Sequence, residues 1–309
     1  MAKHSKSTNI ISMQLIITDL TKTYKNGVKA IDISNLTIGT GMFGLLGPNG
    51  AGKSSLMRTI ATLQSPDSGS IQFGDINVLE DKMALRKILG YLPQSFGVYP
   101  KMSAEDLLDY FATLKGISSK SERQALVKEV LDITNLYDMR KKHVAGYSGG
   151  MKQRFGIAQL LLNNPKLIIV DEPTAGLDPA ERHRFLNVLR EVGTNCTVIF
   201  STHIVEDVKE LCNDMAILNG GRILKQATPS AARKELIGQI WTKIIDRDDL
   251  EAHEAKYNVL SSNYNEDNSL NIRVFSSEIP DTEFHSAEPQ LDDVYFIALR
   301  EDEPVLAKS

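Results

Sequence analysis

The sequence contains little cysteine and has no long apolar run. Only two cysteines are present, Cys196 and Cys212, and their spacing fits neither a C-x-x-C redox pair nor a zinc site. We expect both to be buried thiols in a reducing compartment. No apolar run approaches the roughly 18–20 residues that cross a bilayer. If this protein works at a membrane, another chain must therefore supply the spans.

The composition also lacks a strong excess of charge. The chain is 42% hydrophobic and 24% charged, and its formal net charge of −4 offers no general attraction to nucleic acid or to an anionic membrane surface. We therefore expect no nucleic-acid partner. The basic run 140–143 is interpreted as a solvated loop. Residues 1–12 begin with a polar stretch unlike a signal peptide and are predicted to form a flexible arm.

A glycine-rich segment is the most informative feature of the chain. Residues 47–54 match the P-loop pattern G-x-x-x-x-G-K-[ST], between an apolar run at 42–46 and a predicted helix at 55–63. In such a loop the backbone N–H groups cradle phosphates, the lysine contacts the β- and γ-phosphates, and the serine hydroxyl ligates Mg²⁺. The predicted nucleotide-binding residues here are Gly47, Asn49, Gly50, Gly52, Lys53, Ser54 and Ser55.

Two acidic residues and one histidine follow apolar runs further along the chain. The run 167–170 predicts a core strand that places Asp171 at its carboxyl end, where such sheets bind ligands, so Asp171 is a candidate Mg²⁺ ligand. Glu172 is a candidate general base for an attacking water. His203 follows the run 197–200 and is a candidate donor to a γ-phosphate oxygen.

A second anion-binding pattern precedes the acidic pair. Ser148, Gly149 and Gly150 open a predicted helix, and their N–H groups together with the helix dipole favour a bound anion. A single triphosphate needs only one P-loop. We therefore predict a head-to-tail dimer in which each nucleotide lies between the P-loop of one copy and Ser148–Gly150 of the other.

The pattern of elements predicts an α/β fold. Residues 13–46 alternate apolar and polar residues and indicate an antiparallel β region, whereas 103–132 show helical spacing inside an α/β core. A separate unit with strand-like and helix-like runs begins near residue 237. We predict a P-loop NTPase core with an antiparallel β subdomain and a helical subdomain, followed by a small C-terminal α+β domain, with bounds 13–236 (helical subdomain about 95–150) and 237–309.

Taken in order, these motifs resemble the ATP-binding-cassette (ABC) ATPases over roughly residues 13–228. The resemblance implies that 47–54 is the Walker A loop, that Asp171 and Glu172 are the Walker B pair, that 148–150 is the core of the signature motif and that His203 is the switch histidine. It further implies roles for three residues that are weak signals alone: Tyr24 stacks on adenine, Gln94 contacts Mg²⁺ and water, and Asp178 belongs to the D-loop.

The signature departs from the usual Leu-Ser-Gly-Gly-Gln. Tyr147 and Met151 replace its first and last residues, which leaves the serine hydroxyl and the glycine backbone intact. Glu172, His203 and Gln94 are present as catalytic candidates, and Ser54, Gln94 and Asp171 as metal ligands. The resemblance therefore implies an active ATPase with ATP and Mg²⁺ as cofactors.

The tail refines the resemblance. Residues 288–296 are similar to the closing motif of cassettes that serve ABC-2-type exporters. This implies a second copy or a paralogous cassette, a separately encoded integral membrane subunit, and a cytoplasmic location on the inner face of the cell membrane. In the family a coupling helix docks at the position of 96–102, where Phe96, Val98 and Tyr99 are either its apolar contact surface or internal core residues.

Two other functional classes remain as alternatives. The first is a soluble non-transport ABC ATPase that acts on nucleic acid or on a protein complex, but the single cassette, the absence of a long coiled-coil insertion and the negative net charge disfavour it. The second is a P-loop kinase or GTPase, for which Ser148–Gly150 would have no use. Strong, salt-sensitive binding to nucleic acid would favour the first alternative.

Overall fold

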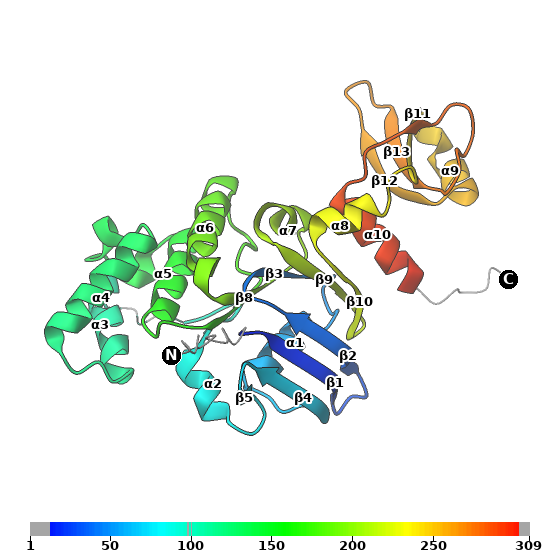
Figure 1. The fold of residues 1–309 in the computed structure, drawn as a ribbon. Coiled ribbons are helices and arrows are strands. Elements are labelled where there is room, and N and C mark those ends of the chain that lie inside the picture. The colour runs from blue at the N-terminus through cyan, green and yellow to red at the C-terminus, as the bar shows by residue number, and fades with distance from the viewer. Residues whose placement is uncertain (1–12, 98, 100, 303–309) are drawn as a thin grey trace, which may run out of the picture.

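A computed structural model describes residues 13–97, 99 and 101–302 and shows a mixed α/β architecture with three sheets. A central sheet carries a helical lobe on one side and a C-terminal unit on the other, and an antiparallel sheet lies next to it (Figure 1). The predicted fold class is confirmed. The arm expected at 1–12 lies outside the described residues. Within these ranges no helix combines the length and the apolar character needed to span a bilayer.

The central sheet has six strands in the order β10-β9-β3-β8-β7-β6 and is parallel except for β10. Strands β7 and β8 are buried at every residue, as expected for a parallel sheet that is covered on both faces. The strands are β3 (Gly41–Leu46), β6 (Leu89–Leu92), β7 (Leu167–Asp171), β8 (Thr197–Thr202), β9 (Asp214–Asn219) and β10 (Arg222–Ala227).

Four main helices cover the two faces of this sheet. In β7, Ile168 and Val170 face one core cluster, which contains apolar residues of α5, α6 and α7, whereas Leu167 and Ile169 face another, which contains those of α1. Alternate side chains of β7 therefore pack against helices on opposite faces of the sheet. The helices are α1 (Lys53–Ile60), α5 (Gly149–Leu161), α6 (Pro179–Val192), which η3 (Gly193–Asn195) follows, and α7 (Val205–Leu211).

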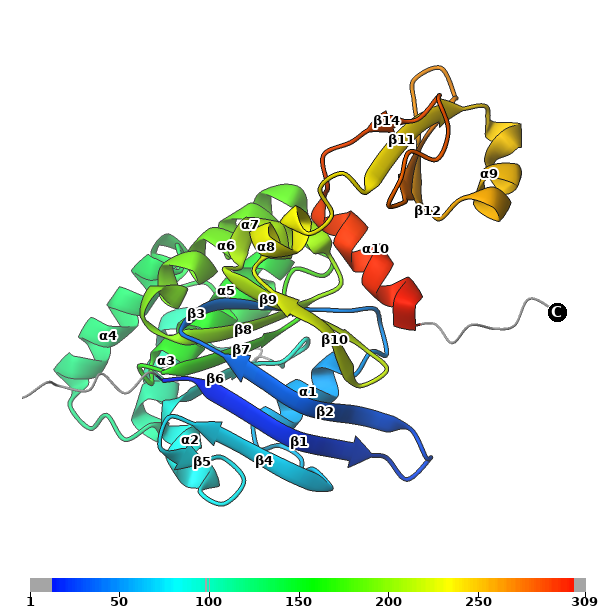
Figure 2. The same cartoon turned by 45° about the vertical axis from the view of Figure 1, so that its right-hand side comes forward.

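The second sheet is antiparallel, in the order β2-β1-β4-β5, and α1 packs between it and the central sheet (Figure 2). The prediction of antiparallel pairing over 13–46 is wrong for residues 41–46, because β3 pairs in parallel with β8 and β9. Five of the six β3 residues are buried. Such a strand must be covered on both faces, which the central parallel sheet provides. The antiparallel strands are β1 (Leu15–Thr23), β2 (Lys29–Ile38), β4 (Ser68–Phe73) and β5 (Ile76–Asn77).

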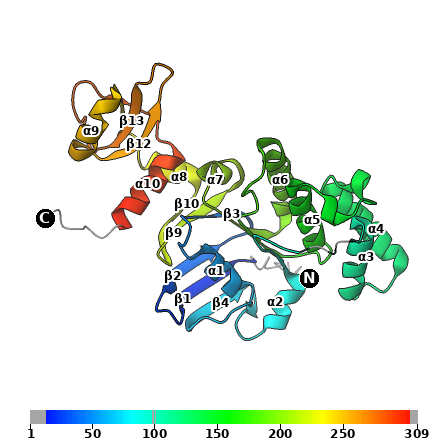
Figure 3. The same cartoon turned by 180° about the vertical axis from the view of Figure 1, so that it is seen from behind.

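The helical lobe has its own apolar core, formed with α5 (Figure 3). Ser103 caps the first of its helices, and its hydroxyl accepts a hydrogen bond from the N–H of Asp106 at 3.2 Å. Val98 lies outside the described residues. The elements of this lobe are α3 (Ala104–Leu114), α4 (Lys120–Ile133), η1 (Tyr137–Met139) and η2 (Val144–Gly146). Helix α2 (Lys82–Ile88) lies outside the lobe, because its Leu85 packs in the core cluster of α1 and the antiparallel sheet.

The C-terminal unit is a four-stranded antiparallel sheet with one short helix on a face. Strands and helices both occur in this unit, as expected for the runs that begin near residue 237. The elements after β10 are α8 (Pro229–Lys234), β11 (Ile240–Ile245), η4 (Arg247–Asp249), α9 (Leu250–Lys256), β12 (Val259–Tyr264), β13 (Leu270–Phe275), β14 (His285–Ser286) and α10 (Leu291–Asp302).

Helix α10 connects this unit to the central sheet (Figure 2). Its Val294 belongs to the core cluster of α6 and α7, whereas its Ile297 packs against Ile240 of β11. A bidentate ion pair reinforces the second contact: Arg273 of β13 donates from Nε and Nη2 to the two carboxylate oxygens of Asp293, at 2.9 and 2.6 Å. Asp293 is buried, so its charge depends on this arginine.

We expect Asp293→Ala to destabilise the C-terminal unit by about 3–5 kcal/mol, because it leaves a largely buried arginine without its counter-charge. The single tryptophan, Trp241, lies in β11, so its fluorescence during denaturant unfolding reports on this unit. Asp292→Ala is the matched control and should change the free energy of unfolding by less than about 1 kcal/mol. Equal transition midpoints for the two variants would contradict the role of the ion pair.

Candidate functional site

Four neighbouring strands end at the same edge of the central sheet, and each is followed by a predicted site segment. Strand β3 leads into the P-loop and β8 leads to His203, while β7 ends at Asp171 and β6 precedes Gln94. Because β3, β8, β7 and β6 are adjacent and parallel, their carboxyl ends must lie side by side. Segments as far apart in sequence as residues 47 and 203 therefore lie close together at this edge.

The P-loop is held against two other backbone segments. A Cβ atom on Gly47 would lie 2.3 Å from the carbonyl oxygen of Leu218, and one on Gly52 would lie 2.3 Å from that of Ala30. Gly52 also has a φ of 107°, in the left-handed region that favours glycine. Only glycine fits at these two positions, so the turn into α1 is fixed by close backbone packing.

Lys53 is buried at the start of α1. Its Nζ donates to the carbonyl oxygens of Gly47 at 2.7 Å and Pro48 at 3.0 Å, and it lies 3.1 Å from Oε1 of Glu172. A cavity of about 440 Å³ opens over this lysine, and its walls come from the P-loop and its surroundings. The lining residues are Tyr24, Val28, Ala30, Asn49, Gly50, Ala51, Gly52, Lys53, Ser54, Ser55, Gln94 and Glu172.

Asp171 is nearly buried at the end of β7, and its Oδ1 accepts a hydrogen bond from Ser201 Oγ at 2.8 Å. Burial raises the pKa of this carboxyl, and hydrogen bonds from Ser201 and Ser54 oppose that rise. The oxygen donors of Ser54 and Asp171 fit Mg²⁺, which commonly takes one or two protein oxygens together with phosphates and water. In the described part of the chain no cluster of three or more His, Cys, Asp or Glu residues could hold a metal.

The other two catalytic candidates, Gln94 and His203, lie close to the carboxylate of Glu172. Its Oε2 lies 3.5 Å from Nε2 of Gln94 and 3.5 Å from Nδ1 of His203. Its φ of 45° is unusual for a residue with a side chain, and its N–H is held by both the carbonyl oxygen and the Oγ of Ser201, at 3.2 and 3.0 Å. The structure therefore brings Glu172, Gln94 and His203 together in one cluster beside Lys53.

Tyr24 lies at the rim of the same cavity. Its hydroxyl shares a hydrogen bond with Ser55 Oγ at 3.0 Å and donates to Oε1 of Gln64 at 3.1 Å. The ring is partly exposed, and the contact with Ser55 fixes it relative to α1. An aromatic face is thus available next to the P-loop.

The segment 148–150, the second predicted anion site, lies outside the lining of the P-loop cavity. Ser148 caps α5 by accepting a hydrogen bond from the N–H of Met151 at 3.3 Å, and a Cβ atom on Gly150 would lie 2.2 Å from Oε2 of Glu181. Asp178 caps α6 in the same way. Among the described residues that line the P-loop cavity, none belongs to 148–150 or is Asp178. A single chain does not bring these two groups together.

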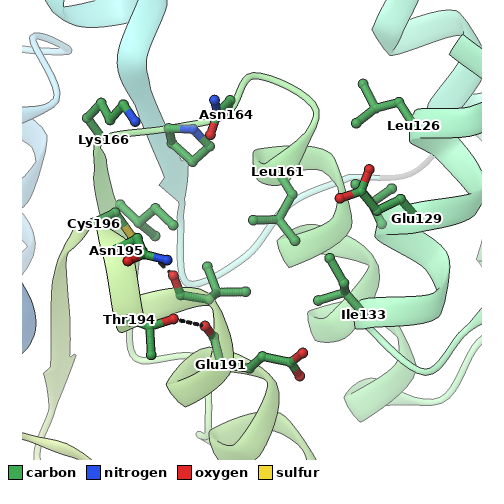
Figure 4. A pocket seen from close by; sticks show the side chains of 14 residues that line it. Leu126, Glu129, Ile133, Leu161, Asn164, Lys166, Glu191, Thr194, Asn195 and Cys196 are labelled. Carbon is green, nitrogen blue, oxygen red and sulfur yellow. Dashed lines mark hydrogen bonds between the residues drawn. The ribbon is translucent and has the colours of Figure 1, made fainter. Parts of the chain in front are cut away.

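A larger cavity, of about 560 Å³, lies away from this edge of the sheet (Figure 4). It is lined by α4, α5 and residues near the amino ends of β7 and β8, including Lys166 and Cys196. Strands β7 and β8 carry Asp171 and His203 at their opposite ends. None of the predicted nucleotide-site residues is among the described residues that line this larger cavity. Both cysteines are buried and free, as predicted.

Ser201 is the site residue that the sequence did not reveal. It contacts both members of the acidic pair, and its side chain is completely buried. The available signal was a polar residue that directly follows an apolar strand and lies two positions before His203. That signal gains meaning only when β8 is known to pair with β7.

Comparisons with known proteins agree with this geometry. A family model described as ABC transporter matches residues 32–175. The ABC transporter ATP-binding protein YxlF of Bacillus subtilis is 38% identical over 209 residues, which cover 68% of this chain and 69% of that protein. Nod factor export ATP-binding protein I of Rhizobium etli is 36% identical over 224 residues, or 71% and 70% of the two chains.

A solved structure shows the same fold with nucleotide products. This is a dimeric ATP-binding cassette in a post-hydrolysis state with bound ADP and Pi, which matches with a TM-score of 0.62 and 26% identity over 69% of this chain and 98% of that one. The sequence relatives establish the family. The chain therefore belongs to the ABC transporter ATP-binding proteins, and it is an ATPase subunit.

Proposed function

We propose that this chain powers an ABC-2-type exporter through ATP-driven, head-to-tail dimerisation of two cassettes. The observation that supports the dimer is the separation of Ser148–Gly150 from the P-loop cavity. A helix N-terminus that opens with serine and glycine suits a phosphate, and a second cassette is the source of that phosphate. The exporter assignment is supported by the relative that is named as an export ATP-binding protein.

Within each site, Glu172 acts as the general base for the attacking water. Gln94 and His203 orient that water and the γ-phosphate, which is supported by their shared 3.5 Å approach to Glu172 Oε2. Lys53 neutralises charge on the β- and γ-phosphates, and Tyr24 stacks on the base. Across the dimer, Ser148–Gly150 and Asp178 complete the site of the partner.

Ser54, Asp171 and Gln94 would hold Mg²⁺. The bound ion would neutralise charge that develops on the phosphates during transfer. Asp171 suits this role because burial disfavours its lone charge, so a cation beside it is stabilising. Residues 13–236 form the ABC ATPase domain, with its helical subdomain at about 95–150, and residues 237–309 form an accessory domain, supported by a separate small apolar core.

The membrane subunit docks beside the segment that follows Gln94, which places the chain on the cytoplasmic, inner face of the cell membrane. Tyr99 is 52% exposed and packs against Tyr110 of α3, with ring centroids 6.3 Å apart. Exposed aromatic pairs are favoured at protein interfaces. Phe96, in contrast, is partly buried and packs against the core cluster of α5, α6 and α7.

We expect Lys53→Ala to weaken ATP binding by at least about tenfold to a hundredfold, because a charge-assisted contact to phosphate is worth roughly 1.5–3 kcal/mol. Isothermal titration calorimetry measures this directly. The matched control is Lys120→Ala, since Lys120 is an exposed lysine at the start of α4. ATP affinity equal to that of the wild type would contradict the assignment of the P-loop.

We expect Glu172→Gln to slow hydrolysis by about a hundredfold or more, because it removes the base, while ATP still binds. With Mg²⁺ and ATP, light scattering should then show twice the 34.2 kDa mass of the chain. Glu206→Gln changes an exposed carboxylate and should behave as the wild type. If Glu172→Gln hydrolyses ATP at the normal rate, another residue is the base.

Purification of the tagged chain from gently solubilised membranes should capture a stoichiometric multi-span protein. We expect Tyr99→Asp to reduce this capture at least about tenfold, since a charge in a docking surface leaves an unpaired buried group. Tyr264→Asp is the control, because Tyr264 is 63% exposed on the C-terminal sheet. Capture of soluble proteins or nucleic acid alone, with the ATPase still active, would favour the non-transport alternative.

A further inference from the structure

A completely buried carboxylate lies behind the catalytic cluster without contributing to the nucleotide cavity. Asp207 is on α7, four residues after His203, and its exposed fraction is 0%. One carboxylate oxygen, Oδ2, accepts hydrogen bonds from Thr174 Oγ1 at 2.7 Å and Thr202 Oγ1 at 3.1 Å. The other, Oδ1, accepts from Nε of Arg182 at 2.6 Å.

These contacts connect Asp207 to three segments that carry site residues. Thr174 lies two positions after Glu172. Thr202 directly precedes His203, and its Oγ1 also accepts from the N–H of Ile204 at 2.9 Å. Arg182 is on α6, which begins next to the D-loop segment. A single carboxylate thus holds the chain on both sides of the Glu172–His203 contact.

The local backbone explains why such a link is needed. Glu172 has a φ of 45°, a strained conformation that persists only where surrounding contacts fix it. The N–H of Glu172 donates a hydrogen bond to Ser201. After Glu172, the next side chain that fixes the backbone is Thr174, whose hydroxyl donates to Asp207. The backbone of Thr202 also accepts from the N–H of Gly47 at 3.3 Å, so the same link reaches the P-loop.

Energetics argue against a purely structural role. Burial of a carboxylate is costly, and a well-packed apolar residue would serve the core of α7 at least equally well. The retained advantage of such a buried charge is a unique arrangement of its partners. Here the partners are the segments that present the base and the histidine, together with Arg182 of α6.

We propose that Asp207 is a positioning residue that holds Glu172 and His203 in register for hydrolysis. The inference rests on the roles proposed above for Glu172 and His203. Asp207 does not touch the P-loop cavity, so it acts on the rate of the bound complex and leaves ATP binding almost unchanged.

The test compares steady-state hydrolysis by the full chain with Asp207→Asn. The amide keeps the size of the side chain but places a donor against Arg182 or the threonines. We expect kcat to fall by about tenfold to a hundredfold, the effect of small misplacements near reacting groups, while the Kd for ATP changes by less than about twofold. Val208→Ala, at a buried neighbour on α7, should lower thermal stability but retain kcat.

Two smaller changes cover the case in which Asp207→Asn does not fold. Thr174→Val and Thr202→Val each remove one hydroxyl at nearly constant volume. Each should lower kcat at least about threefold with the Kd for ATP retained, and combining either with Asp207→Asn should add little, because the pair acts as a unit. Wild-type kcat in both valine variants, or a raised Kd with normal kcat, would overturn the proposal.

Glu172→Gln separates this inference from the proposed catalytic assignment. If Glu172→Gln is inactive and Asp207→Asn is fully active, only the positioning role fails. If Glu172→Gln itself remains active, the catalytic assignment fails first, and a loss of activity in Asp207→Asn would then have to act through another group.

Discussion

The site depends on one constraint, the parallel order β3-β8-β7-β6 in the central sheet. Parallel neighbouring strands end at the same edge of the sheet. This brings together four parts of the site that are far apart in the sequence: the P-loop, His203, the acidic pair and Gln94. The order requires crossover connections through α5, α6 and the helical lobe. Helices α5, α6 and α7 bury one face of the strands, and α1 covers the other. Core packing and active-site assembly are thus consequences of the same topology.

Several charged side chains in and around this site are buried and paired. Lys53, Asp171 and Asp207 are each almost fully buried, and each has partners that compensate its charge or satisfy its hydrogen-bonding capacity. Glu172 adds backbone strain at the same place. These contacts all lie within one chain, whereas in the proposed dimer a second cassette completes the site, because Ser148–Gly150 lies apart from the cavity.

Much of the site was predictable because its motifs are local. The P-loop spans eight consecutive residues, and the pair Asp171–Glu172 directly follows an apolar strand, so the chemistry could be recognised from short patterns. Helix caps such as Ser103 are equally local. Ser201 and Asp207 were missed, because their partners lie up to 33 residues away and a buried serine or aspartate has no periodic signature.

The sequence by itself determined the nucleotide chemistry, the alternation of strands and helices, and the ABC family resemblance, because short stretches of consecutive residues carry each of these signals. Tertiary structure alone decided that β3 pairs in parallel instead of joining the antiparallel region, because burial of both its faces is a property of the packed sheet. It also decided that α10 connects two cores and that Asp207 joins three segments of the chain. Such long-range pairings depend on which elements cover one another, and short sequence patterns do not encode that.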